Sequence, residues 1–141
     1  MANFASIKTK VVTILEALTN LDSGSVFGYE PEVGEVDQDP FAVVVASGNE
    51  NDFASSSENK RSYGFSIRLY VERKSRGLEN AETLLQTMVD NLINALDQDY
   101  TLGGEVLISK AAPSSWGYIL GDKEYRTAEI IVTAEDWYDV T

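Results

Sequence analysis

The sequence contains no cysteine and no histidine among its 141 residues. Without these side chains the chain has no thiolate or imidazole to act as a nucleophile, as a base or as a zinc ligand. It also cannot form a disulfide framework. A bound metal would have to be held by carboxylates, carbonyls and water.

Long apolar runs are also missing. No run approaches the ~18 residues needed to span a bilayer, and residues 1–4 lack the charged and apolar regions of a signal peptide. Hydrophobic residues make up 43% of the chain and proline and glycine are few, as in folded globular proteins. We therefore expect one soluble domain over residues 1–141, not placed in a membrane, since ~150 residues is a typical domain size.

Basic residues are scarce and unevenly placed. The chain has 11 of them against 23 acidic residues, a formal charge of −12, which disfavours tight wrapping of nucleic acid. Residues 11–59 carry no lysine or arginine but ten acidic residues. A basic block then follows at once: Lys60, Arg61, Arg68, Arg73, Lys74 and Arg76.

The two charge blocks have two interpretations. Both can be solvated faces of a monomer, or the blocks can meet on neighbouring subunits, where complementary potentials fix orientation and register. In the second case the basic residues contact the acidic segment 30–39 of the next subunit. The candidate interface residues are Asp52, Phe53, Glu58, Lys60, Arg61, Arg73, Lys74, Arg76, Glu35, Asp37 and Asp39.

The apolar spacing predicts two amphipathic helices, one from Phe4 to Leu21 and one over residues 80–96. Residues 41–46 form a continuous apolar run typical of a strand covered on both faces, and residues 61–73 alternate as in a half-buried strand. Further strands are expected over residues 26–29, 106–113, 118–120 and 125–137. The fold class is therefore α+β: two layers, with a mixed or antiparallel curved sheet and two amphipathic helices packed on it.

Residues 48–60 lack periodicity and contain one aromatic residue, Phe53. Loops of this length in a compact domain are usually functional or disordered. We expect this loop to be mobile in the isolated protein and to order on docking, with Phe53 as its apolar anchor.

No pattern in the sequence supports catalysis. Glu35, Asp37 and Asp39 alternate and could hold Ca²⁺ or Mg²⁺ weakly, but the spacing of a calcium-binding loop is missing. A catalytic pair of carboxylates needs a defined distance between them, and the sequence does not set such a distance for Glu135 and Asp136. No glycine-rich nucleotide-binding motif is present. We expect Trp116 and the aromatic residues near it to pack in a hairpin and at an edge of the sheet and not to form a ligand site. We therefore expect no enzymatic activity, no cofactor and no metal.

The order of elements, with segments 4–21, 40–45, 61–71, 80–96 and 125–132, resembles the tail terminator proteins of long-tailed bacteriophages over nearly the whole chain. The resemblance implies a hexameric ring that caps the tail tube, ends its polymerisation and offers its other face to the head connector. It also implies assembly in the bacterial host cytoplasm and a final place in the virion. The family supplies no motif residues whose roles could be transferred.

The expected partners are further copies of the chain, the tail tube protein and the head–tail connector protein. DNA would pass through a negative lumen without specific binding. Two alternatives stay open: a head–tail joining or connector-side neck protein of similar size and layout, and a monomeric acidic partner-binding domain.

Overall fold

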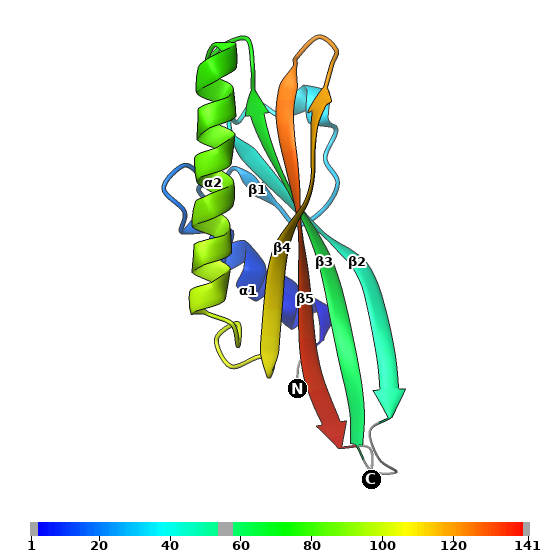
Figure 1. The fold of residues 1–141 in the computed structure, drawn as a ribbon. Helices are drawn as coiled ribbons and strands as arrows, with labels where there is room; N and C mark the ends of the chain where they lie inside the picture. The colour runs from blue at the N-terminus through cyan, green and yellow to red at the C-terminus, as the bar shows by residue number, and fades with distance from the viewer. Residues whose placement is uncertain (1–2, 54–57, 140–141) are drawn as a thin grey trace.

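The structure is a computed structural model that describes residues 3–53 and 58–139, with the backbone alone for residues 49–53, 58 and 138–139. Two helices and an open, mixed, five-stranded sheet form the domain, which confirms the expected α+β class (Figure 1). The elements are α1 (Phe4–Glu16), β1 (Val26–Phe27), a 3-10 turn η1 (Val33–Glu35), β2 (Phe41–Phe53), β3 (Glu58–Glu72), α2 (Leu78–Gln98), β4 (Ile108–Ile119) and β5 (Tyr125–Asp139).

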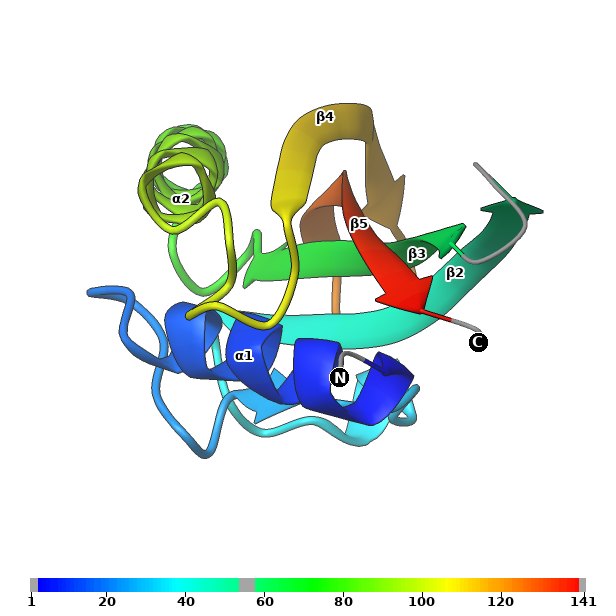
Figure 2. The ribbon, with the colours of Figure 1, turned by 90° about the horizontal axis from the view of Figure 1, so that it is seen from below.

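The strands lie in the order β1-β2-β3-β5-β4, with β1 parallel to β2 and all other neighbours antiparallel. Both helices pack on one face of this twisted sheet (Figure 2). Helix α1 contacts β1 and β2, whereas α2 contacts β3, β4 and β5. The other face, which we call the helix-free face, has no α-helix on it in the described part of the chain, and the connection that contains η1 covers part of it.

Local sequence explains where the helices begin. At α1, the Asn3 side chain accepts a hydrogen bond from the Ser6 amide at 2.8 Å, and the Ser6 hydroxyl accepts one from the Asn3 amide at 3.0 Å, a reciprocal cap that satisfies two free donors. At α2, Gly77 precedes the first turn with a φ of +90°. Only glycine adopts that backbone conformation without strain.

The main core lies between the helices and the sheet. Helix α2 contributes Leu85, Met88 and Leu92 to it, and β3 contributes Phe65 and Ile67, all at most 2% exposed. The apolar stripe of the helix and the period-two alternation of the strand therefore meet as the sequence predicts.

A second, smaller core lies on the opposite face of the sheet. Phe41 stacks on Tyr70 with ring centroids 4.5 Å apart, and Tyr125 meets Phe41 edge-on. Val33 and Val36 of the connection between β1 and β2 cover these rings. Residues 41–44 are thus buried on both sides of the sheet, which confirms the interpretation of the apolar run.

Two sequence expectations are wrong. Residues 48–53 and 58–60 do not belong to a loop: β2 and β3 continue as an antiparallel pair through Phe53 and Asn59. Residues 54–57 lie outside the described residues. The paired ends of these strands reach beyond both helices (Figure 1), so no apolar layer covers them and no apolar alternation marks them as strands.

The first helix also ends earlier than its apolar stripe indicates, at Glu16 instead of Leu21. Successive tight turns follow, with the Leu18 amide donating to Leu15 and the Leu21 amide to Leu18. Leu18 and Leu21 still pack on the core. A chain of i to i+3 turns keeps nearly the same spacing of side chains as a helix, so the stripe runs past the helix end.

Strand β4 forms one edge of the sheet and is interrupted near its middle. Its pairing with β5 shifts register between Pro113 and Ser115. Proline cannot donate to a ladder and is confined to edges and bulges. Most of β4 is exposed, including Trp116 and Tyr118.

Candidate interaction surfaces

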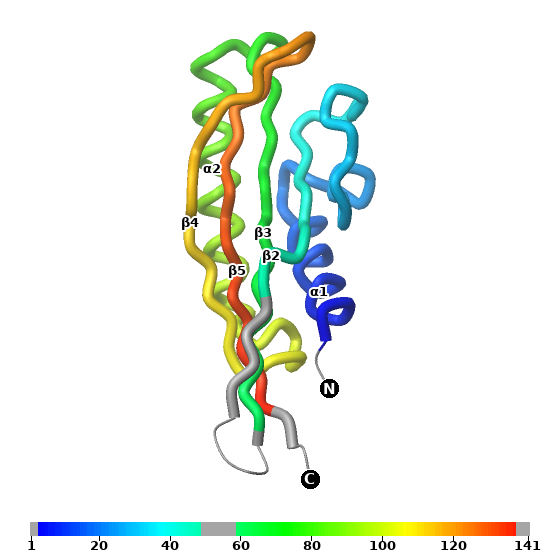
Figure 3. The backbone as a smooth tube through the Cα atoms, turned by 90° about the vertical axis from the view of Figure 1, so that its right-hand side faces the viewer, coloured from blue at the N-terminus to red at the C-terminus, as the bar shows by residue number. Residues whose placement is uncertain are grey.

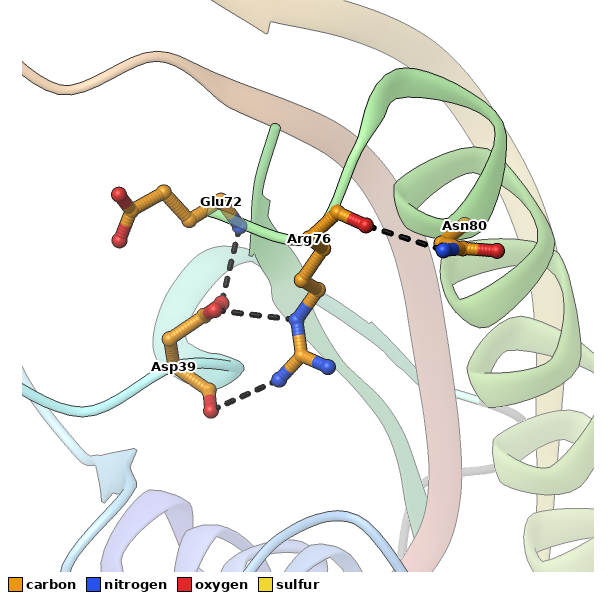
Figure 4. Close-up of polar contacts among 4 residues, drawn as sticks. All are labelled: Asp39, Glu72, Arg76 and Asn80. Atoms are coloured by element: carbon orange, nitrogen blue, oxygen red, sulfur yellow. Dashed lines mark hydrogen bonds and ion pairs between the residues drawn. The ribbon is translucent and has the colours of Figure 1, made fainter. Parts of the chain in front are cut away.

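The first candidate site, the acidic segment 30–39, is tied to its own chain through Asp39 (Figure 4). Asp39 accepts hydrogen bonds from the Arg76 side chain at 3.0 Å and from the Glu72 amide at 2.9 Å. Arg76 also donates to the Asp39 carbonyl at 3.0 Å, and its own carbonyl accepts from Asn80. We call these four residues the Asp39 clamp.

The Asp39 clamp gives Asp39 and Arg76 partners within their own chain, and their expected contact with neighbouring subunits stays a prediction. The two residues are 37 positions apart in the sequence but form an ion pair within one chain. The positions of charged residues along the sequence do not distinguish an ion pair within one chain from an ion pair between subunits. Arg68 likewise pairs with Glu30 of its own chain.

The remaining candidate residues divide into four groups, of which the last, Glu35 and Asp37, lies in the connection between β1 and β2. Lys60 lies 3.6 Å from Glu135 across the β3–β5 pairing, and Arg61 follows it on β3. Asp52, Phe53 and Glu58 have backbones in the β2–β3 hairpin, but their side chains lie outside the described residues. Their role in docking, and the mobility expected for residues 49–60 in the isolated protein, therefore stay predictions.

Arg73 and Lys74 form the third group. Each lies 3.7 Å from the carboxylate of Glu124, so that two cations share one anion. Lys74 is well exposed. These contacts are too long for hydrogen bonds and leave both cations free to interact with a further carboxylate.

Sequence reasoning missed a cluster that forms beside the basic residues. Arg126 donates to both carboxylate oxygens of Glu82, at 2.8 and 3.2 Å, and to the Gly117 carbonyl at 2.9 Å. Its guanidinium lies over the rings of Tyr118 and Trp116, and Arg73 lies over Tyr118 at 4.7 Å. We call Arg73, Leu78, Trp116, Tyr118 and Arg126 the aromatic–arginine cluster.

The residues of this cluster are visible in the sequence, but only the register between β4 and β5 shows that they lie together. Trp116 and Tyr118 alternate on β4, and pairing with β5 sets Tyr118 directly beside Arg126. Trp, Tyr and Arg are the residues most enriched at the energetic centres of interfaces. Tyr118 is 57% exposed and Trp116 is 41% exposed, so the cluster forms a surface and not a core.

The Glu82–Arg126 contact shifts both ionisations. The hydrogen bond from Arg126 lowers the pKa of Glu82, against a smaller opposing effect of desolvation. The same bond raises the pKa of Arg126. The charged forms therefore stabilise the fold at neutral pH, by only ~0 to 1 kcal/mol because Glu82 is partly exposed.

We expect Glu82→Gln to reduce the acid sensitivity of the protein. A lowered folded-state pKa stabilises the native state above the unfolded pKa, and this stabilisation is lost as the pH falls through the folded value. Wild type should therefore lose more stability than Glu82→Gln between about pH 5 and pH 3. Melting curves across this range measure the difference, and parallel pH profiles would contradict it. Glu79→Gln, an exposed neighbour on α2, is the control.

The connection between β1 and β2 forms a second surface. A hollow of about 280 Å³ is lined by apolar residues Phe27, Tyr29, Pro31 and Val36 and by polar residues Glu32, Glu35, Asp37 and Gln38. Within the described ranges, Glu32, Glu35 and Asp37 have no cation within 4.0 Å. We call this region the acidic hollow.

The helix-free face of the sheet carries a third feature, a shallow hollow of about 400 Å³. Its lining is mostly small: Ser47, Gly48, Ser62, Gly64, Ile131, Thr133 and Glu135. A Cβ at Gly64 would lie 3.0 Å from the Ser47 hydroxyl and 3.3 Å from the Gly48 amide nitrogen, so a larger residue there would require its neighbours to shift.

Among the described residues, no three acidic side chains gather in a way that could hold a metal ion. No helix in residues 3–53 and 58–139 is both long enough and apolar enough to cross a membrane. A comparison with models of protein families finds no match, and a comparison with curated proteins finds none either.

Proposed function

We propose that the chain is a tail terminator protein whose subunits close into a hexameric ring. The ring would cap the phage tail tube, end its polymerisation and provide the joining surface for the head connector. The role is structural, not catalytic. The observation that carries this proposal is the asymmetry of the sheet: both α-helices pack on one face, and the part of the other face beyond the second core is lined mostly by small side chains.

The helix-free face suits the lining of a channel. Ser62, Gly64, Thr127 and Thr133 make it smooth, and Glu129 accepts a hydrogen bond from the Ser66 hydroxyl at 2.7 Å. Antiparallel sheets commonly keep one face solvated. In a ring with the helices outside, this face would border the lumen.

The charges on this face also favour passage of DNA over binding. Two of its described cations, Lys60 and Arg68, are paired with Glu135 and Glu30, and the third, Lys110, lies on the edge strand β4. Phosphate binding needs clustered lysines and arginines. DNA would therefore meet a face whose described cations form no cluster to hold it.

Native mass spectrometry of the full chain tests the proposal. We expect a discrete species of six times the chain mass of 15.5 kDa, with a ring visible by electron microscopy. A monomer at micromolar concentration would contradict the ring and favour an acidic partner-binding domain. A ring that leaves the length of polymerising tail tubes unchanged would instead indicate a connector-side joining protein.

A further inference from the structure

We propose that the aromatic–arginine cluster of one subunit docks into the acidic hollow of the next copy of this chain. The inference rests on the proposed ring and names the contact that would close it. It also replaces the broader expectation that all basic residues between Lys60 and Arg76 face the acidic segment of a neighbour.

Charge favours this pairing. Arg73 and Lys74 share the single carboxylate of Glu124, so this side of the contact has a surplus of positive charge. In the acidic hollow, Glu35 and Asp37 have no ion-pair partner in the described part of the chain. Lys123, the cation that reaches this region, donates to the Val36 carbonyl at 3.0 Å. Unmatched charges of opposite sign steer subunits together and fix their register.

The apolar parts of the two surfaces are complementary as well. Tyr118 projects between Arg73 and Arg126, which lie 4.7 and 4.5 Å from its ring centre. Leu78 beside it is 61% exposed. The acidic hollow has apolar walls from Tyr29 and Pro31 and is large enough for one aromatic ring. Such an aromatic side chain with a polar tip contributes much of the energy at interface centres.

The aromatic–arginine cluster is held in place before docking. The Glu82 carboxylate and the Gly117 carbonyl fix the Arg126 guanidinium, and the guanidinium in turn supports the Tyr118 ring. Ordering a side chain at an interface costs free energy. Because the cluster is already ordered, docking would lose less of its binding free energy to that cost.

The positions of the two surfaces fit a ring. The cluster lies at the α2 and β4 side of the sheet, and the acidic hollow lies in the connection beside β1. Figure 3 shows α2 and residues 28–36 on opposite sides of the molecule. A contact between two different surfaces of identical subunits is heterologous, and such contacts close into a ring when the rotation per subunit allows it.

A paired charge reversal tests the contact. Variant A carries Arg73→Glu and Lys74→Glu, and variant B carries Glu35→Lys and Asp37→Lys. Each variant alone places like charges across every contact, so we expect at least a ~tenfold weaker assembly at low salt than for wild type. Mixed together, A and B present opposite charges at every contact, and assembly should return.

The subunit composition of the rings is the readout for the mixture, because favourable contacts form only between a subunit of A and a subunit of B. A closed ring must then contain equal numbers of each, which a hexamer satisfies with three of each. With a mass tag on variant B, native mass spectrometry of the mixture resolves this composition. Rings of random composition, rings formed by A or B alone as in wild type, or no recovery in the mixture would each overturn the proposed contact.

A second pair of variants tests the apolar anchor. Tyr118→Ala should lose assembly while keeping the melting temperature near that of wild type, because Tyr118 is largely exposed. Tyr100→Ala is the matched control, since Tyr100 is 54% exposed and Tyr118 is 57% exposed. Equal assembly of both variants would overturn Tyr118 as the anchor.

The oligomeric state of the wild-type protein shows whether a negative result concerns the contact alone or also the proposed function on which it rests. If wild type forms hexamers and variants A and B do so equally well, the ring stands and the contact is wrong. If wild type stays monomeric, the proposed function fails, and the contact fails with it.

Discussion

Replacing Leu92 with alanine is expected to lower the free energy of unfolding by ~2 to 5 kcal/mol. Leu92 is fully buried on α2, in the cluster that joins this helix to β3 and β5. Truncation removes buried methyl groups and leaves a cavity that the rigid sheet fills only in part. The loss is a large share of the ~5 to 15 kcal/mol that stabilises a typical domain.

Urea unfolding followed by circular dichroism measures this effect. Leu107→Ala is the control, since it makes the same chemical change at a side chain that is 54% exposed. It should change stability by less than ~0.5 kcal/mol. If the two variants unfold at the same urea concentration, α2 does not pack on the sheet as described.

The second large effect is expected at the Asp39 clamp. Asp39→Ala removes the acceptor for the Glu72 amide and the partner of the Arg76 guanidinium. Both carboxylate and guanidinium are mostly shielded from water, so the donors left behind are not fully compensated. We expect a loss of about 1.5 to 3 kcal/mol, the usual range for hydrogen bonds to charged groups.

Asp39→Asn separates the hydrogen bonds from the charge. The asparagine oxygen can still accept from the Glu72 amide, so this variant should lose less stability than Asp39→Ala. Hydrogen exchange should also show faster exchange for residues 28–40 in Asp39→Ala, because the clamp ties this connection to the turn before α2. An Asp39→Ala protein with wild-type stability and exchange would contradict the role of the clamp.

The sequence predicted the fold wherever one face of an element is apolar and the other is not. The alternation from Tyr63 to Val71 and the stripe from Ala81 to Leu96 both match buried positions. The prediction failed at the ends of two elements. In the β2–β3 hairpin, backbone pairing continues without a covering layer, and after Glu16 tight turns imitate the spacing of a helix.

The candidate surfaces were harder to predict because they depend on distant partners. A block of positive charge was visible from Lys60 to Arg76, but the partners of its cations come from several distant parts of the chain. Arg76 binds Asp39, whereas Arg73 approaches Glu124. The aromatic–arginine cluster could be predicted only with the register between β4 and β5. The spacing of residues along a single strand does not give that register.

The interruption of β4 at Pro113 has a consequence for the protein at high concentration. An uninterrupted edge strand offers unpaired backbone groups on which further chains can stack into fibrils. Stacking segments are typically six or seven residues long and contain no proline. Pro113 and the register shift beside it divide the edge into residues 108–112 and 115–119, each shorter than such a segment. The strand can therefore present exposed aromatic rings to a specific partner while its backbone resists growth into amyloid.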